Sequence, residues 1–444
     1  MLALASSLAH LVIVKCEMRR SRTYVTNTPT MAADPDDCPV SETQPPSEPP
    51  APAWHEATTA VHAGREDLPA LGVHAIPIDL STTNPLPDIE AGGGSYENLA
   101  TGGTLGDGDS AVYRRLWSPT VARLERAVAA LEDPEGAASG RTEAVAFATG
   151  MAAIAAVFTS CVRAGRGHVV AVRPLYGGTD HILANGVTGT DVTYVSAEDA
   201  GSAINERTGV VVCESPANPT LELLDISALA LRCGSVPVMV DNTFATPVLQ
   251  KPLLAGAGIV VHSATKYIGG HGDAMGGIVI TDSQRARQLR SLRAITGGLL
   301  DPFSAYLLLR GLPTLGIRMR QQQENAGVLA QWLATRPEVA TVFYPGLPGA
   351  TNAHLLGSQM TGPGAMVSID LAGGYTAAER LCSRLQLVLH AVSLGGFDTL
   401  IQHPAALTHR PVAAEAKPGG GVLRISVGLE DPRDIIADFE QALR

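Results

Sequence analysis

The chain has 444 residues, of which 45% are hydrophobic and 17% charged, and its formal net charge is −11. This length and apolar content are enough for a large core divided over two or three domains. The acidic balance argues against nucleic acid as a partner, and no apolar run reaches the length of a membrane span. The six cysteines are scattered without a CxxC pair, so neither disulfides nor structural zinc are expected. We therefore expect a soluble, cytoplasmic globular protein.

The first 53 residues are expected to be a disordered tail, or a stretch wrongly assigned to the protein. Residues 1–14 are apolar but lack the leading basic residues of a signal peptide, because Lys15, Arg19 and Arg20 come after them. Residues 32–52 are rich in Pro, Asp, Glu and Ser, which is the composition of disordered chains. Met31 is an alternative start.

Ordered sequence is predicted to begin near Trp54. Residues 54–117 contain much Gly, Pro, Thr and Asp with few periodic segments, and predict an extended arm. At its end, Ser118 suits a helix N-cap and Pro119 suits the first helical turn. A helix is therefore predicted there, ending near Glu132.

Seven short apolar runs follow from Ala144, separated by helical stretches and turns. Because they are apolar throughout rather than alternating, they are typical of a mostly parallel sheet covered on both faces. The predicted fold class is therefore α/β. The runs are residues 144–148, 168–173, 191–196, 209–213, 236–240, 258–262 and 276–280.

The regular spacing of predicted strands ends after Asp301, and helices are predicted over 305–310 and 321–333. From about Val339 the sequence mixes strands and helices, and a last helix is predicted over 431–443. We expect one domain over residues 118–315 and a second, smaller domain over 316–444.

Lysine is rare in this chain, which contains only Lys15, Lys251, Lys266 and Lys417 and otherwise uses arginine as its cation. Arginine can replace a solvated surface lysine, but it can neither form a Schiff base nor lose its proton at usable pH. Lys266 lies at the end of a predicted strand, beside two hydroxyl side chains. A lysine kept in such a place indicates chemistry.

The ends of other predicted strands also carry polar groups, and ligands of open α/β sheets bind at the carboxyl ends of the strands. The turn at Gly150, the loop tyrosine Tyr176 and the proline-fixed loop at Asn218 each have an ordinary structural explanation when taken alone. Asp241 follows a buried strand, where a carboxylate needs a cation or hydrogen-bond donors. Together with Lys266, these groups supply the amine, carboxylate, aromatic face and anion-binding turn that pyridoxal phosphate requires.

The stretch from Gly258 to Gly272, with its Ser-Ala-Thr-Lys-Tyr core, resembles the cofactor-lysine signature of the Cys/Met metabolism pyridoxal-phosphate enzymes. That family includes cystathionine synthases and lyases, methionine γ-lyases and homoserine-ester sulfhydrylases. The resemblance covers roughly residues 58–443. It implies PLP fold type I, the aspartate-aminotransferase-like fold, with a large, mostly parallel seven-stranded sheet domain and a smaller C-terminal α/β domain.

The resemblance also implies roles for individual residues. Lys266 would form the Schiff base with the cofactor and shuttle protons, Asp241 would pair with the pyridine nitrogen, and Tyr176 would stack on the ring. The phosphate would be held by Gly150, Met151, Ser263 and Thr265. The substrate carboxylate would be bound by Arg424, whose guanidinium is a natural carboxylate partner, with Ser393 and Asn218 close by.

The family's active sites are shared between subunits of a homotetramer, which is a dimer of dimers. Tyr113 and Arg115 resemble the Tyr-x-Arg element that reaches the phosphate of the neighbouring subunit's cofactor, so the arm at 54–117 would contribute to that site. Tyr113 or Tyr176 would protonate the leaving group. Two positions depart from the family pattern: Ser118 replaces an asparagine, and Gly258 replaces an acidic residue.

Three features bear on the reaction. Residues 270–273 (Gly-His-Gly-Asp) and 402–405 (Gln-His-Pro-Ala) resemble methionine γ-lyases more than sulfhydrylases. Val392 occupies the position where many cystathionine γ-lyases carry a glutamate for the distal amino group. Against a methionine γ-lyase, Gly178 replaces the typical cysteine. We expect γ-elimination on a sulfur amino acid substrate, giving 2-oxobutyrate, ammonia and a thiol. The alternatives are γ-replacement on an O-acyl-homoserine, or cystathionine γ-lyase activity.

Functions from other classes of protein agree less well with the sequence. Ser263 and Lys266 match the Ser-x-x-Lys of serine acylases, but the later motifs of that class are missing, because the only lysine after Lys266 is Lys417, followed by proline. A protein that binds without turnover is disfavoured by the complete set of site residues. The histidines form no metal-binding pair at helical spacing, so no metal is expected.

Overall fold

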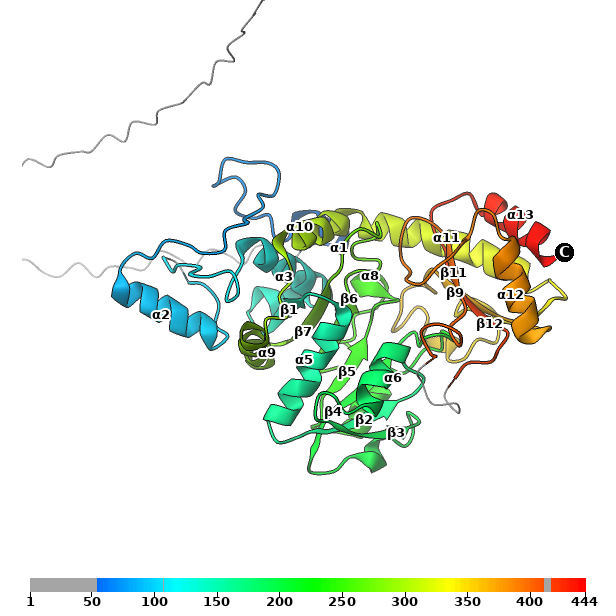
Figure 1. Cartoon of the computed structure of the whole chain (residues 1–444), viewed down its shortest axis with the longest axis horizontal. Helices are drawn as coiled ribbons and strands as arrows, with labels where there is room; N and C mark the ends of the chain where they lie inside the picture. The colour runs from blue at the N-terminus through cyan, green and yellow to red at the C-terminus, as the bar shows by residue number, and fades with distance from the viewer. Residues whose placement is uncertain (1–53, 107, 411–416) are drawn as a thin grey trace, which may run out of the picture. The chain divides into compact units, whose positions relative to one another are not determined.

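The computed structural model describes residues 54–106, 108–410 and 417–444. The predicted tail at residues 1–53, with Lys15, Cys16 and Cys38, lies outside these ranges. Two sheets and their covering helices belong to one compact unit that extends from Pro52 to Arg444 (Figure 1). The division at residues 315 and 316 therefore stays a prediction.

The larger sheet has seven strands in the order β1-β7-β6-β5-β4-β2-β3. Only β7 runs against its neighbours, so the sheet is mostly parallel as predicted. The edge strand β3 is half exposed, whereas the inner strands β2 and β4 and the other edge strand β1 are mostly buried. The strands are β1 (Thr142–Phe147), β2 (His168–Val172), β3 (Asp191–Val195), β4 (Thr208–Glu214), β5 (Val238–Asp241), β6 (Ile259–Ser263) and β7 (Gly277–Asp282).

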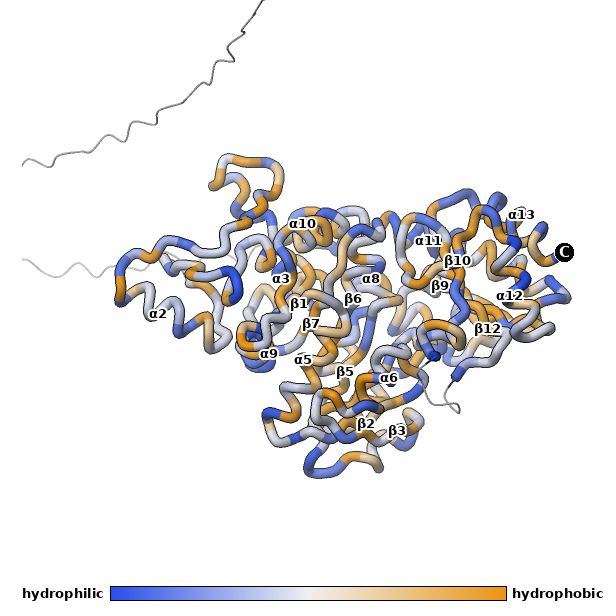
Figure 2. Tube along the Cα trace, in the orientation of Figure 1, coloured by the Kyte–Doolittle hydropathy of each residue, from blue (hydrophilic) through white to orange (hydrophobic). Residues whose placement is uncertain are grey.

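Helices cover both faces of this sheet, which explains why its strands are apolar throughout (Figure 2). The first face packs against α5 (Gly150–Arg163) and α9 (Ser283–Thr296), and the second against α3 (Pro119–Glu132) and α10 (Pro302–Gly311). The predicted cap and end of α3 are confirmed, since the Ser118 side chain accepts a hydrogen bond from the Val121 amide. The remaining helices of this part are α4 (Pro134–Ala138), α6 (Gly177–Ala184), η1 (Ala200–Ala203), α7 (Ile226–Cys233) and α8 (Thr246–Leu249).

The segment at 54–117 differs from the extended chain that its composition predicts, because it contains α1 (Glu56–His62) and α2 (Ile89–Ala100). The Asp88 side chain caps α2 by accepting a hydrogen bond from the Ala91 amide. That cap offsets part of the low helix propensity of the glycines at 92–94. The long stretch between the two helices has no helix or strand of its own.

A second sheet of five strands follows, in the order β10-β11-β12-β9-β8. It packs against α11 (Leu315–Leu333), α12 (Gly374–Arg384) and α13 (Pro432–Leu443), so the predicted helices at 321–333 and 431–443 are confirmed. The strands are β8 (Val339–Phe343), β9 (Met366–Leu371), β10 (Leu389–His390), β11 (Leu400–Gln402) and β12 (Val422–Ser426), and the short turns are η2 (Leu312–Thr314) and η3 (Ala353–Leu355). In the register of this sheet Gln402 lies opposite Arg424.

Two further features concern the surroundings of the protein. Within residues 54–106, 108–410 and 417–444, no helix is both long and apolar enough to span a bilayer. The four cysteines in these ranges carry free thiols: Cys161, Cys213, Cys233 and Cys382.

Candidate active site

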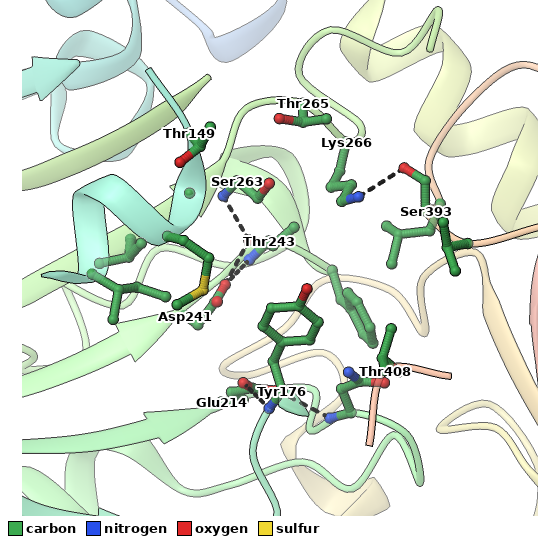
Figure 3. A pocket seen from close by; sticks show the side chains of 18 of the residues that line it. Thr149, Tyr176, Glu214, Asp241, Thr243, Ser263, Thr265, Lys266, Ser393 and Thr408 are labelled. Carbon is green, nitrogen blue, oxygen red and sulfur yellow. Dashed lines mark hydrogen bonds between the residues drawn. The ribbon is translucent and has the colours of Figure 1, made fainter. Parts of the chain in front are cut away.

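A cavity of about 390 Å³ opens at the carboxyl ends of β4, β5 and β6, where the second sheet approaches the first (Figure 3). It lies where open α/β sheets bind their ligands. Every site residue predicted from the sequence lines this cavity, apart from two. The predicted site residues that line it are Gly150, Met151, Tyr176, Asn218, Asp241, Ser263, Thr265, Lys266, Ser393 and Arg424.

Lys266 lies three residues after the end of β6, and its side chain points across the cavity to Ser393 (Figure 3). Its Nζ donates a hydrogen bond of 2.7 Å to the Ser393 hydroxyl. Burial, together with the nearby Arg424 charge, lowers the pKa of the Lys266 amine to about 8, so a sizeable fraction is neutral near physiological pH. The backbone of Ser393 has φ of 86°, a left-handed conformation that costs energy and is common at functional sites.

Lys251, the other partly buried lysine in the described residues, differs from Lys266 in its surroundings. Its Nζ is held by the Glu56 carboxylate at 2.7 Å and by two backbone carbonyls, of Leu131 and Pro247. These bonds join α1, α3 and α8 away from the cavity. Lys251 therefore has a structural role, and Lys266 is the lysine available for chemistry.

Asp241 ends β5 on the floor of the cavity. Its Oδ1 accepts hydrogen bonds from the Thr243 amide at 3.0 Å and from the Thr243 hydroxyl at 2.5 Å. Burial raises the pKa of the carboxyl, and the two bonds from Thr243 oppose that rise. The Thr243 hydroxyl also accepts from the Ser263 amide at 2.8 Å. Thr243 thus fixes Asp241 relative to the β6 end, a role that the sequence interpretation missed.

The N-terminus of α5 forms one corner of the cavity. The Thr149 hydroxyl caps the Ala152 amide at 3.0 Å, which leaves the amides of Gly150 and Met151 at the mouth of the helix. A side chain on Gly150 would come within 3.0 Å of the Ser263 side chain, so glycine permits this close approach. Helix amides and a serine hydroxyl together suit a phosphate. The Thr265 hydroxyl lines the same cavity but is bonded to the Gly276 backbone.

Arg424 comes from β12, in the other sheet, and its guanidinium is buried. It donates to Asn218 Oδ1 at 3.0 Å, to the Ser393 carbonyl at 3.1 Å and to Gln402 Oε1 at 2.6 Å. Burial lowers its pKa to about 10, so it stays charged at neutral pH. Its Nε has no partner within the described residues. A fixed guanidinium fork of this kind is suited to a carboxylate ligand.

The sequence indicated Gln402 only as part of the 402–405 motif. It did not predict that Gln402 contacts Arg424. Its register opposite Arg424 on the neighbouring strand places the two side chains on the same face. The alternation of β11 and β12 could have indicated this pairing, but β11 has only three residues, too few for a periodic signal.

Tyr176 precedes α6, and its ring projects into the cavity (Figure 3). Burial raises the pKa of the phenol, so the hydroxyl keeps its proton at neutral pH and is a potential acid. Its backbone amide donates to the Glu214 carboxylate at 2.5 Å. Glu214 ends β4, lines the cavity and was not identified from the sequence as a site residue.

Tyr113 and Arg115 are the two predicted site residues that do not line the cavity of their own chain. The Tyr113 side chain is 44% exposed. Arg115 donates to the Ala294 carbonyl at 2.5 Å, at the end of α9. A single chain therefore does not bring these residues to the site.

The donor set in the cavity fits pyridoxal phosphate. It combines a free amine with a lowered pKa, a buried carboxylate, a helix N-terminus for the phosphate and an aromatic ring, all within one enclosed space. The described residues hold no cluster of three or more histidine, cysteine or acidic side chains that could bind a metal. The fold and the site together define an enzyme that depends on pyridoxal phosphate.

The chain belongs to the Cys/Met metabolism PLP-dependent enzyme family, whose model matches residues 57–444. The L-methionine gamma-lyase of Brevibacterium aurantiacum is 57% identical over 88% of this chain and 94% of its own length. The cystathionine gamma-synthase of Mycobacterium bovis is 40% identical over 87% of this chain and 96% of its own.

A solved structure supports the same assignment. That of apo CalE6, a methionine gamma lyase from Micromonospora echinospora, is similar with a TM-score of 0.76 at 34% identity, covering 88% of this chain and 99% of that one. The predicted PLP fold type I and the predicted family are thus confirmed.

Proposed function

We propose that the enzyme is a methionine γ-lyase, which converts methionine and water into 2-oxobutyrate, ammonia and methanethiol. The observation that carries the proposal is the nature of the cavity wall around Ser393. Val392 and Leu394, which flank the Ser393 partner of the Lys266 amine, line the cavity, and so does Phe244. A thioether side chain suits such a wall.

The charged groups of the cavity support methionine over cystathionine. The acidic residues that line it are Asp241 and Glu214, and both accept hydrogen bonds from backbone amides. No carboxylate in the described lining is left for the distal ammonium group of cystathionine. An unpaired ammonium beside Val392 would lose hydration without gaining a partner.

The residues would divide the reaction among them. Gly150, Met151 and Ser263 would hold the phosphate, Asp241 the pyridine nitrogen and Tyr176 the ring face. The bound cofactor withdraws electrons from the α-carbon of the amino acid. Arg424, with Asn218 and Ser393, would bind the substrate carboxylate. These assignments rest on the contacts of each residue in the cavity.

Proton transfers would follow from the same contacts. The neutral Lys266 amine takes the proton from the α-carbon, since its lowered pKa leaves it partly unprotonated. Tyr176 retains its proton because burial raises its pKa, and it can donate that proton to the departing sulfur. As the bond between the γ-carbon and sulfur breaks, a proton would leave the β-carbon, and Lys266 would accept it once it has passed on the proton from the α-carbon.

Product analysis tests the proposed reaction. We expect the purified enzyme to release 2-oxobutyrate, ammonia and methanethiol from methionine in equal amounts, with a slower reaction on cystathionine. The runner-up is γ-replacement, because the same residues serve both reactions and a relative is a cystathionine gamma-synthase. If only O-acetylhomoserine reacts, and added thiol changes the product from 2-oxobutyrate to a thioether, the enzyme catalyses γ-replacement instead.

We also propose that the active form is a cytoplasmic homotetramer, a dimer of dimers, in which the segment at 54–117 completes the neighbouring site. Tyr113 is exposed and stands outside the cavity of its own chain, as does Arg115. The same segment exposes several large apolar side chains, which is typical of an interface: Leu71, Val73, Leu80, Leu86 and Ile89. The free thiols of the described cysteines suit a reducing compartment.

Mixed subunits give a direct test of shared sites. Lys266→Ala and Arg115→Ala chains are each expected to be inactive as pure oligomers. Coexpression should restore about a quarter of wild-type activity, because random pairing makes about half of the dimers mixed and each mixed dimer has one site with both intact residues. The measurement is 2-oxobutyrate formation by tetramers that carry two different affinity tags. Tag-purified mixtures with no activity above the pure variants would contradict the shared site.

A further inference from the structure

Glu214 occupies a place in the site that the proposed reaction does not use. It is the last residue of β4, it is buried, and it lies beside Asp241 in the register of β4 and β5. A buried carboxylate persists only where donors compensate for its lost hydration.

The donors to Glu214 come from two different loops. Oε1 accepts from the Tyr176 amide at 2.5 Å, and Oε2 accepts from the Asn218 amide at 3.2 Å. The first loop carries the ring that projects into the cavity. The second carries the side chain that accepts from Arg424 at 3.0 Å. One carboxylate therefore joins the aromatic wall of the cavity to its carboxylate clamp.

The Tyr176 loop has little freedom on its other side. A side chain on Gly177 would come within 2.0 Å of the Thr408 carbonyl, so the loop is packed tightly against the backbone after β11. His409 contacts the Leu175 carbonyl through Nε2 at 3.3 Å. With the loop confined from that side, the bond to Glu214 sets where the Tyr176 backbone stands.

We infer that Glu214 is a positioning residue that fastens the Tyr176 loop and the Asn218 loop together, and so links cofactor binding to recognition of the substrate carboxylate. This inference rests on the proposed function for the identity of the substrate. In the proposed reaction Glu214 would contact none of the reacting atoms of the substrate. It acts through its hydrogen bonds with the Tyr176 and Asn218 amides. The Glu214 carboxyl also lies close to Arg424 and Asp241. Burial, followed by the nearby Asp241 charge, raises the pKa of Glu214.

The test uses the Glu214→Gln holoenzyme. Glutamine keeps the size of the side chain but turns one acceptor into an NH2 donor, which faces a backbone N–H and cannot accept its hydrogen bond. We expect the dissociation constant of pyridoxal phosphate to rise roughly tenfold, and that of 4-(methylsulfanyl)butanoate, a methionine analogue without the amino group, to rise by a similar factor. Equilibrium dialysis and calorimetry measure the two constants without turnover.

Kinetics and spectra separate positioning from simple structural damage. In Glu214→Gln, the KM for methionine should rise more than kcat falls, and the visible absorption band of the bound cofactor should shift as the Tyr176 ring moves. Asp438→Asn is the matched control, since the buried Asp438 accepts the amides of Gln386, Leu387 and Val388 away from the cavity. It should lower Tm but leave both constants and the absorption band unchanged.

Two outcomes would overturn the inference. One is a Glu214→Gln protein with both dissociation constants within twofold of wild type. The other is an equal loss of affinity in Asp438→Asn at an equal fall in Tm. If Glu214→Gln does not fold, Glu214→Asp serves instead, because it keeps the charge but is one methylene too short to hold both amides. Because the constants are measured without catalysis, failure of the proposed reaction would show separately, as no 2-oxobutyrate from the wild-type enzyme.

Discussion

The Lys266→Arg enzyme is expected to lose activity on methionine by about 10⁴-fold or more, because it loses both the covalent attachment of the cofactor and the proton-transferring amine. Arginine keeps the positive charge near Ser393 but cannot lose its proton. Borohydride treatment followed by peptide mapping should fix the cofactor on the Lys266 peptide of the wild type and on no peptide of the variant. The assay for activity is 2-oxobutyrate formation.

Lys251→Arg is the matched control for this substitution. Lys251 is also partly buried, but it bonds to Glu56 and to backbone carbonyls away from the cavity. We expect near wild-type activity, with an effect on Tm only. Residual activity of Lys266→Arg within tenfold of wild type would exclude Lys266 as the essential amine.

The pH dependence of cofactor attachment gives the same residue a second signature. The folded pKa of Lys266 is lowered to about 8, first by burial and then by Arg424. Below that pH the neutral fraction falls tenfold for each pH unit, so the rate of covalent uptake by the apoprotein should fall in proportion and level off above about pH 8. A midpoint near 10.5, the ordinary value for lysine, would contradict this assignment.

The Arg424→Lys enzyme is expected to bind methionine about a hundredfold more weakly, with a smaller change in kcat. Lysine retains a charge but cannot hold Asn218, Gln402 and the Ser393 carbonyl while presenting a planar fork to a carboxylate. Loss of one hydrogen bond between charged groups costs about 1.5–3 kcal/mol, which corresponds to roughly ten- to a hundredfold in affinity. Initial rates over a range of methionine concentrations measure KM and kcat separately.

Arg293→Lys controls for the general effect of shortening a buried arginine. Arg293 pairs with Glu125 at 2.6 Å and donates to the Ala146 carbonyl, outside the cavity. Its replacement should reduce Tm and leave the KM for methionine unchanged. An equal rise in KM in both variants, or no rise in Arg424→Lys, would remove Arg424 from the substrate clamp.

Much of the site could be predicted because parallel strands place their carboxyl ends at one edge of the sheet. Asp241 and Lys266 follow neighbouring strands β5 and β6, so their order in the chain was enough to bring them together. The turn at Gly150 follows β1, and Gly150 lies against Ser263 at the end of β6. The two helices within 54–117 were missed because a glycine-rich sequence hides helical periodicity, and only the Asp88 cap marks the start of α2.

The sequence by itself determined the α/β class, the parallel sheet and the unusual lysine at the end of a strand. These depend on local patterns of apolar residues and on the scarcity of one residue type. Only the tertiary structure decided the partners of Arg424, the fastening of two loops by Glu214 and the position of Tyr113 outside its own cavity. Those contacts join segments up to 206 residues apart, as between Arg424 and Asn218, and their burial sets the pKa values, so no local pattern encodes them.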